Sequence, residues 1–225
     1  MTWVKICGTT SLRDAQLSVA AGADALGFIF ASSPRRIEVE IATEIIAALS
    51  GQAEMIGVFV NETPQLVAEV AQQVGLTGVQ LYGDEPVDSL RNFRRVLGDR
   101  KLIKVLHPRE LQDGYGRLAT YLAARDSIDA ILLDSGSPER GGGTGTAYDW
   151  NQALPIAEKL REALPLIIAG GLNSHNVVEA IDLFDPWGVD VASGVEAAPG
   201  QKHEAKLRNF IAAVRQATAT VRQKE

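Results

Sequence analysis

The chain has 225 residues, of which 22 are Lys or Arg and 28 are Asp or Glu, so its formal net charge is −6. This mild acidity disfavours nucleic acids and anionic membranes as partners, because both bind clusters of Lys and Arg. A single cysteine allows no internal disulfide, which favours a reducing compartment. The first residues lack the layout of a signal peptide, and no apolar run approaches the roughly 20 residues that span a bilayer. We therefore expect a cytoplasmic protein.

Short runs rich in Val, Ile and Leu alternate with longer amphipathic segments along the whole chain. The predicted strands are Val4–Cys7, Ala25–Phe30, Met55–Val60, Gly78–Tyr82, Leu102–Leu106, Ala130–Asp134, Leu166–Ala169 and Val189–Ser193. The predicted helices are Leu12–Ala21, Ile41–Leu49, Pro64–Val74, Val87–Leu97, Leu118–Arg125, Asn151–Leu164, Asn176–Phe184 and Lys206–Ala217. Ser11, Thr63 and Asp149 precede helices and are expected to cap them.

Strict alternation of strands and helices predicts a parallel sheet with right-handed crossovers. Eight such units in a chain of this length favour a single-domain α/β fold, the (β/α)8 or TIM barrel, over residues 1–217. The polar tail, residues 218–225, is expected to fray. The alternative is a doubly wound open sheet. Its dinucleotide-binding form is disfavoured, because no Gly-x-Gly-x-x-Gly follows the first strand.

In a barrel, functional residues gather where strands end. Alternation along the first strand turns Lys5 and Cys7 toward the barrel interior, and the same parity turns Asp134 and Asp190 inward. A lone buried cysteine is more often an inert core residue. However, a cluster of charged groups at one barrel mouth is costly to bury, so packing alone does not explain it. These four side chains are therefore candidates for an active site.

Glycine-rich loops follow the last three predicted strands. They contain Gly142 and Gly143, Gly170 and Gly171, and Ser193 and Gly194. Glycine lets successive backbone N–H groups converge on an anion, and the loops after the seventh and eighth strands are a frequent phosphate site of this fold. The alternative is that these glycines only form turns. The two last loops together favour phosphate binding.

Arg36 lies in the loop after the second strand, where its guanidinium can pair with a substrate carboxylate or simply be solvated. The three histidines are scattered, and no His, Cys or Asp grouping has the spacing of metal ligands. We therefore expect no metal and no organic cofactor.

Taken in order, these motifs resemble those of the phosphoribosylanthranilate isomerase family of tryptophan biosynthesis. The resemblance extends from Lys5 to about Phe210. The motifs that carry it are Lys5–Gly8, Gly22–Phe28, Ser33–Arg36, Val58–Asn61, Val79–Leu81, Leu132–Asp134, Gly142–Gly145, Asp149–Trp150, Ala169–Leu172, Val189–Glu196 and Pro199–Gly200.

The resemblance implies a cofactor-free Amadori rearrangement of a small phosphosugar by general acid–base catalysis. The product is 1-(2-carboxyphenylamino)-1-deoxyribulose 5-phosphate. In this interpretation Cys7 is the general base, Asp134 is the general acid and Arg36 holds the anthranilate carboxylate. The last glycine-rich loops would bind the phosphate, and Asp190 would belong to the substrate-binding residues. Lys5 is expected to favour the thiolate form of Cys7.

Two positions depart from the family pattern. Tyr82 stands where the family usually has His, and Ala192 stands where it often has Ser. The first departure puts a contact of that imidazole in question, and the second removes a hydroxyl near the phosphate loop.

Three rival functions remain at this point. A related sugar isomerase of histidine biosynthesis would have Asp in place of Cys7 and a second phosphate loop after the third or fourth strand, where acidic residues stand here. A non-catalytic phosphosugar-binding barrel would keep the glycines but not both Cys7 and Asp134. A cysteine hydrolase would need a His close to Cys7. The choice between a monomer and a homodimer is open.

Overall fold

A computed structural model describes residues 1–111, 116–134 and 150–221. Its eight parallel strands form a closed barrel in chain order, and the first strand also pairs with the eighth. The strands are β1 (Trp3–Cys7), β2 (Ala25–Ile29), β3 (Glu54–Phe59), β4 (Gly78–Leu81), β5 (Lys101–Leu106), β6 (Ala130–Asp134), β7 (Leu166–Ala169) and β8 (Gly188–Val191). The predicted barrel is confirmed, and the open sheet is wrong.

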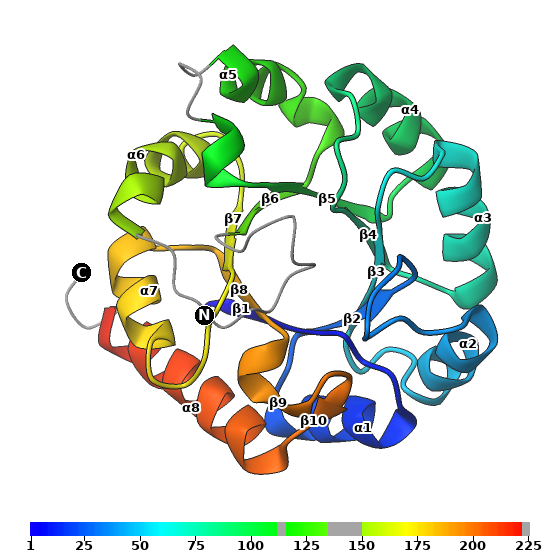
Figure 1. Ribbon diagram of the computed structural model, residues 1–225, viewed down its shortest axis with the longest axis vertical. Helices are drawn as coiled ribbons and strands as arrows, with labels where there is room; N and C mark the ends of the chain where they lie inside the picture. The colour runs from blue at the N-terminus through cyan, green and yellow to red at the C-terminus, as the bar shows by residue number, and fades with distance from the viewer. Residues whose placement is uncertain (112–115, 135–149, 222–225) are drawn as a thin grey trace.

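Helices surround the barrel as an outer ring (Figure 1). They are α1 (Leu12–Ala21), α2 (Val39–Ala48), α3 (Pro64–Val74), α4 (Val87–Leu97), α5 (Gly116–Ala123), α6 (Trp150–Arg161), α7 (Val177–Phe184) and α8 (Glu204–Val221). Short 3-10 turns cover Pro108–Leu111, Arg125–Ser127 and Ser193–Val195. Within the described ranges, no helix is long and apolar enough to cross a bilayer.

Local signals explain several helix boundaries. The Ser11 hydroxyl accepts a hydrogen bond from the backbone N–H of Asp14, and the Thr63 hydroxyl accepts one from the N–H of Leu66, as predicted for N-cap residues. At the C-terminal ends of α1 and α3, Gly22 and Gly75 adopt left-handed conformations with φ of 99° and 82°. The third predicted cap, Asp149, lies outside the described residues.

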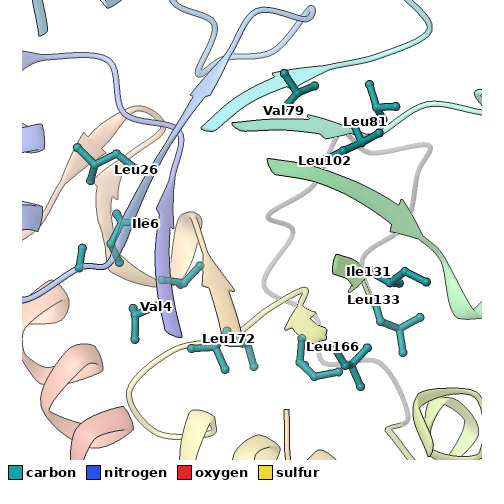
Figure 2. Packing of buried hydrophobic residues seen from close by; sticks show 14 of the residues in the cluster. Val4, Ile6, Leu26, Val79, Leu81, Leu102, Ile131, Leu133, Leu166 and Leu172 are labelled. Carbon is teal, nitrogen blue, oxygen red and sulfur yellow. The ribbon is translucent and has the colours of Figure 1, made fainter. Parts of the chain in front are cut away.

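The barrel wall separates two apolar layers. Figure 2 shows part of the outer layer, between strands and helices, in which the labelled residues are Val4, Ile6, Leu26, Val79, Leu81, Leu102, Ile131, Leu133, Leu166 and Leu172. The inner layer consists of Trp3, Ala25, Ile56, Ile103, Val105, Ala130, Leu132, Ile167 and Ala169. Residues therefore alternate between outer and inner layers along each strand, which is the parity that the sequence predicts.

The C-terminal part of the chain differs from the prediction in two ways. Helix α8 continues beyond Ala217 to Val221, and Thr218 in this extension lies 2.9 Å from the hydroxyl of Thr2. The last four residues lie outside the described ranges. In addition, strand β8 is shorter than predicted, and an antiparallel hairpin that was not predicted follows it, made of β9 (Glu196–Ala198) and β10 (Gln201–Lys202).

Candidate active site

A pocket opens at the C-terminal end of the barrel strands. Its walls include Cys7 from β1, Tyr82 after β4, Asp134 from β6 and Asp190 from β8. The loops after β7 and β8 close one side of it. The strand ends therefore bring three of the four predicted inward residues to one cavity, and the fourth, Lys5, lies beneath it.

Lys5 and Asp190 form a buried ion pair next to Cys7. The Lys5 ammonium donates to Oδ1 of Asp190 over 2.8 Å, and its side chain is fully buried. The two residues are register partners on the neighbouring strands β1 and β8. Gly27 of β2 pairs with Cys7, and a Cβ there would lie 2.8 Å from the cysteine Sγ. The absence of a side chain at Gly27 therefore makes room for the thiol.

The surroundings of Cys7 act on its pKa in opposing directions. Burial raises the pKa of Cys7 above the ordinary thiol value, and the Asp190 carboxylate acts in the same direction. Lys5 and Lys202 oppose this shift without overcoming it. Burial likewise raises the pKa of Asp190, whereas burial of Lys5 is outweighed by the charges of Asp190 and Cys7, which raise the Lys5 pKa. Burial therefore favours the thiol form of Cys7, while Lys5 acts toward the thiolate as expected.

Asp134 ends β6 and contacts the residues that directly follow β4 and β5. The Tyr82 hydroxyl donates to its Oδ2 over 2.8 Å, and Nδ1 of His107 lies 3.2 Å from its backbone oxygen. The rings of Tyr82 and His107 meet edge to face, with centroids 5.2 Å apart. Burial and the negative charge of Asp134 raise the pKa of Tyr82 well above its usual range, so its hydroxyl stays a donor. The departure from the family pattern at Tyr82 thus places a hydrogen-bond donor on Asp134.

The loops after β7 and β8 pack closely against each other. Gly170 and Gly171 have φ of 93° and 67°, a region that favours glycine. A Cβ on Gly194 would collide with the carbonyl oxygen of Leu172. Ser193, Gly170 and Gly171 line the pocket. These predicted glycines therefore meet at one edge of the cavity. Gly142 and Gly143 lie outside the described residues.

The structure brings Arg35, and not Arg36, to the pocket. The Arg36 side chain is 54% exposed and lies 3.5 Å from Glu38. Arg35 is buried, lines the pocket and faces the opposite way. Its Nε and Nη2 donate to the carboxylate of Glu196 over 3.0 and 2.8 Å. The loop pairs with Ile29 of β2 through Arg36, and successive residues of such an extended pairing point to opposite sides.

Glu196 and Lys202 complete a buried charge cluster that the sequence analysis missed. Lys202 donates to Oε1 of Glu196 over 2.8 Å and to the backbone oxygen of Cys7 over 2.5 Å. Burial opposes ionisation of Glu196, but hydrogen bonds from Arg35 and Lys202 hold its pKa below the usual range. Burial lowers the pKa of Lys202. Glu196 lies in a motif that carried the resemblance, but the sequence did not predict that it pairs with Arg35 and Lys202.

Comparison with known proteins identifies the family of this barrel. The family model described as N-(5'phosphoribosyl)anthranilate (PRA) isomerase matches residues 4–213. A curated relative of that name from Rubrobacter xylanophilus is 42% identical over 216 residues, which is 96% of this chain and 100% of the relative. The chain belongs to the N-(5'-phosphoribosyl)anthranilate isomerase family. It is therefore an isomerase of tryptophan biosynthesis.

Solved structures of this family agree with the assignment. The crystal structure of phosphoribosyl anthranilate isomerase from Thermotoga maritima is 40% identical, with a TM-score of 0.82 over 96% of this chain and 100% of that chain. A further isomerase structure contains reduced 1-(o-carboxyphenylamino)-1-deoxyribulose 5-phosphate; it is 37% identical, with a TM-score of 0.79 over the same shares. Membership of the isomerase family confirms the resemblance. It excludes the histidine-pathway enzyme, the non-catalytic protein and the hydrolase.

Proposed function

We propose that the chain rearranges N-(5-phosphoribosyl)anthranilate without a cofactor, with Asp134 as general acid and Cys7 as general base. Asp134 protonates the furanose oxygen, the C1–O bond breaks, and the anilino nitrogen forms a C=N bond. Cys7 then removes the proton from C2, which gives an enol-amine that tautomerises to the ketone. The observation that carries this proposal is that a thiol and a carboxyl, projecting from β1 and β6, line one pocket.

The proposed acid and base need one proton between them. Burial raises the cysteine pKa and so favours the thiol form of Cys7. The reactive form arises when the proton resides on Asp134 instead, a change that leaves the net charge of the pair unaltered. The Tyr82 hydroxyl donates to Oδ2 of Asp134 over 2.8 Å and so helps to hold the carboxyl group in place.

The charged ends of the substrate are assigned to two parts of the pocket rim. The phosphate is placed on Gly170, Gly171, Ser193 and Gly194, whose loops form one edge of the cavity. Gly142 and Gly143 stay predicted members of that group. Asp190 stays a predicted substrate ligand, because it lines the pocket. Its Oδ1 accepts the hydrogen bond from Lys5.

The anthranilate carboxylate is assigned to Arg35, in place of Arg36. Glu196 engages Nε and Nη2 of the guanidinium. Among the residues that the structure describes, Nη1 has no partner, and it is free to donate to a carboxylate in the pocket. A cytoplasmic location stays a prediction, as does the choice between a monomer and a homodimer.

The acid–base assignment is tested with two variants that preserve shape, Cys7→Ser and Asp134→Asn. Serine is too weakly acidic to supply an anionic base, and asparagine cannot deliver a proton as a carboxylic acid does. Each change is expected to lower kcat at least about 100-fold with little change in KM. Turnover is followed as the loss of anthranilate-type fluorescence from freshly made substrate. Wild-type kcat in either variant, with an unchanged circular dichroism spectrum, would remove the assignment.

A further inference from the structure

Gln80 carries an unpaired polar atom at the floor of the pocket. The residue is 2% exposed and lines the pocket, and its Oε1 has no hydrogen-bond partner among the residues that the structure describes. Two other buried side-chain atoms in the described part of the chain are also unpaired, Nε1 of Trp3 and Oγ1 of Thr9. Neither of those residues is among the pocket residues. Gln80 therefore differs from both in facing the cavity.

The position of Gln80 on β4 explains why the protein itself does not satisfy this oxygen. Val79 and Leu81 belong to the outer apolar layer, so Gln80 and Tyr82 face the interior. The register partners of Gln80 on the two neighbouring strands are Val58 and Ile103, which offer no side-chain donor. One level nearer the mouth, the Tyr82 hydroxyl is already donated to Asp134.

A buried amide oxygen without a partner destabilises the folded protein, because it has lost water and gained no donor. An apolar side chain of the same length would fill the same space without this cost. Buried polar groups in native proteins are nearly always paired, so an exception inside a ligand pocket indicates a ligand that supplies the partner.

We infer that Gln80 is a substrate-binding residue whose amide oxygen accepts a hydrogen bond from a hydroxyl of the sugar chain. The inference rests on the proposed function of the pocket. The phosphate and carboxylate of the substrate are acceptors, so the donor must come from the part between them. Gln80 lies two residues below Tyr82, whose partner Asp134 acts on the sugar ring, and this places the sugar hydroxyls nearest to the amide. Gln80 thus selects for a hydroxylated sugar chain.

The test is Gln80→Met, which keeps the length of the side chain and removes its polar atoms. We expect kcat/KM to fall about tenfold, and the affinity for reduced 1-(o-carboxyphenylamino)-1-deoxyribulose 5-phosphate to fall by a similar factor, because the sugar hydroxyl loses its acceptor. Competition by inorganic phosphate should be unchanged, because the phosphate loops are intact. The Tm of the free variant should be equal to or above that of the wild type, because an unpaired buried atom has been removed.

Thr9→Val is the matched control, because it also removes an unpaired buried oxygen but lies outside the pocket lining. It should leave kcat/KM and the affinity for the reduced product unchanged. A lower Tm in Gln80→Met with unchanged affinity for the reduced product would mean that Gln80 is structural, and would overturn the inference.

A measurement on the wild-type protein covers the case in which Gln80→Met does not fold. The side-chain amide NMR signal of Gln80 should shift on addition of the reduced product and not on addition of inorganic phosphate. The inference is overturned if the Gln80 amide signal does not shift when the reduced product is added. These binding measurements do not require turnover, so a wild-type protein without isomerase activity would contradict the proposed function and leave the test of Gln80 intact.

Discussion

The two adjacent arginines of the loop after β2 provide a sharp test of the site, because one is buried and the other exposed. In Arg35→Met the side chain keeps much of its packing but loses the guanidinium that contacts Glu196 over 2.8–3.0 Å. Breaking a buried ion pair costs about 3–5 kcal/mol, and Lys202 still holds Glu196, so we expect about 3 kcal/mol. In a chain of this size that corresponds to a fall in Tm of roughly 6–12 °C.

The same variant loses the donor proposed for the anthranilate carboxylate. A hydrogen bond to a charged group contributes about 1.5–3 kcal/mol, which converts to a rise in KM of roughly 10- to 150-fold. The value of kcat should change less, because the carboxylate is bound equally in the ground and transition states. Arg35→Lys restores the charge without the fork and should recover only part of the loss.

Arg36→Met is the control at the neighbouring position. Its side chain is 54% exposed and its partner Glu38 is 62% exposed, so the pair contributes less than about 1 kcal/mol. Fluorescence progress curves and thermal unfolding should therefore both match the wild type. A large rise in KM for Arg36→Met, with an unchanged KM for Arg35→Met, would refute the assignment of Arg35.

Two further outcomes follow from the surroundings of Asp134 and Cys7. Tyr82→Phe removes the donor to Oδ2 of Asp134 and should lower kcat roughly tenfold with KM unchanged. Tyr82→His should recover part of the rate. Wild-type kcat in Tyr82→Phe would show that Tyr82 does not position Asp134 for catalysis. In the proposed mechanism Cys7 and Asp134 share one proton, which is lost above the Cys7 pKa. Because burial raises this pKa, the alkaline fall of kcat/KM should begin above the ordinary thiol range and should be absent in Cys7→Ser; a fall at or below that range would count against it.

The fold and the inward side chains could be predicted because both depend on short-range periodicity. Strand alternation is sufficient to turn Cys7 and Asp134 into the barrel, and cap residues such as Ser11 mark helix starts from local chemistry alone. The choice between Arg35 and Arg36 has no such local signal. It depends on how the loop pairs with Ile29, a contact that only the folded chain defines.

The surroundings of Cys7 likewise depend on contacts that only the folded chain defines. The sequence places Lys5 two residues away and suggests a direct effect on the thiol. The folded chain also gives Lys5 a carboxylate partner, Asp190 of β8, and burial outweighs the effect of Lys5 on the thiol pKa. The unpaired oxygen of Gln80 likewise depends on which residues flank it on the neighbouring strands.

The contacts around the pocket also constrain when a newly made chain can complete its site. They join residues 185 positions apart for Lys5 with Asp190, 161 for Arg35 with Glu196 and 195 for Lys202 with Cys7. Until the ribosome has released the final fifth of the protein, Lys5 has no counter-ion and the first strand has no eighth strand to pair with. Such distant pairings carry the largest loss of chain entropy and form late in folding. The site is therefore incomplete in every nascent chain that ends before β8, although seven of the eight barrel strands have by then been synthesised.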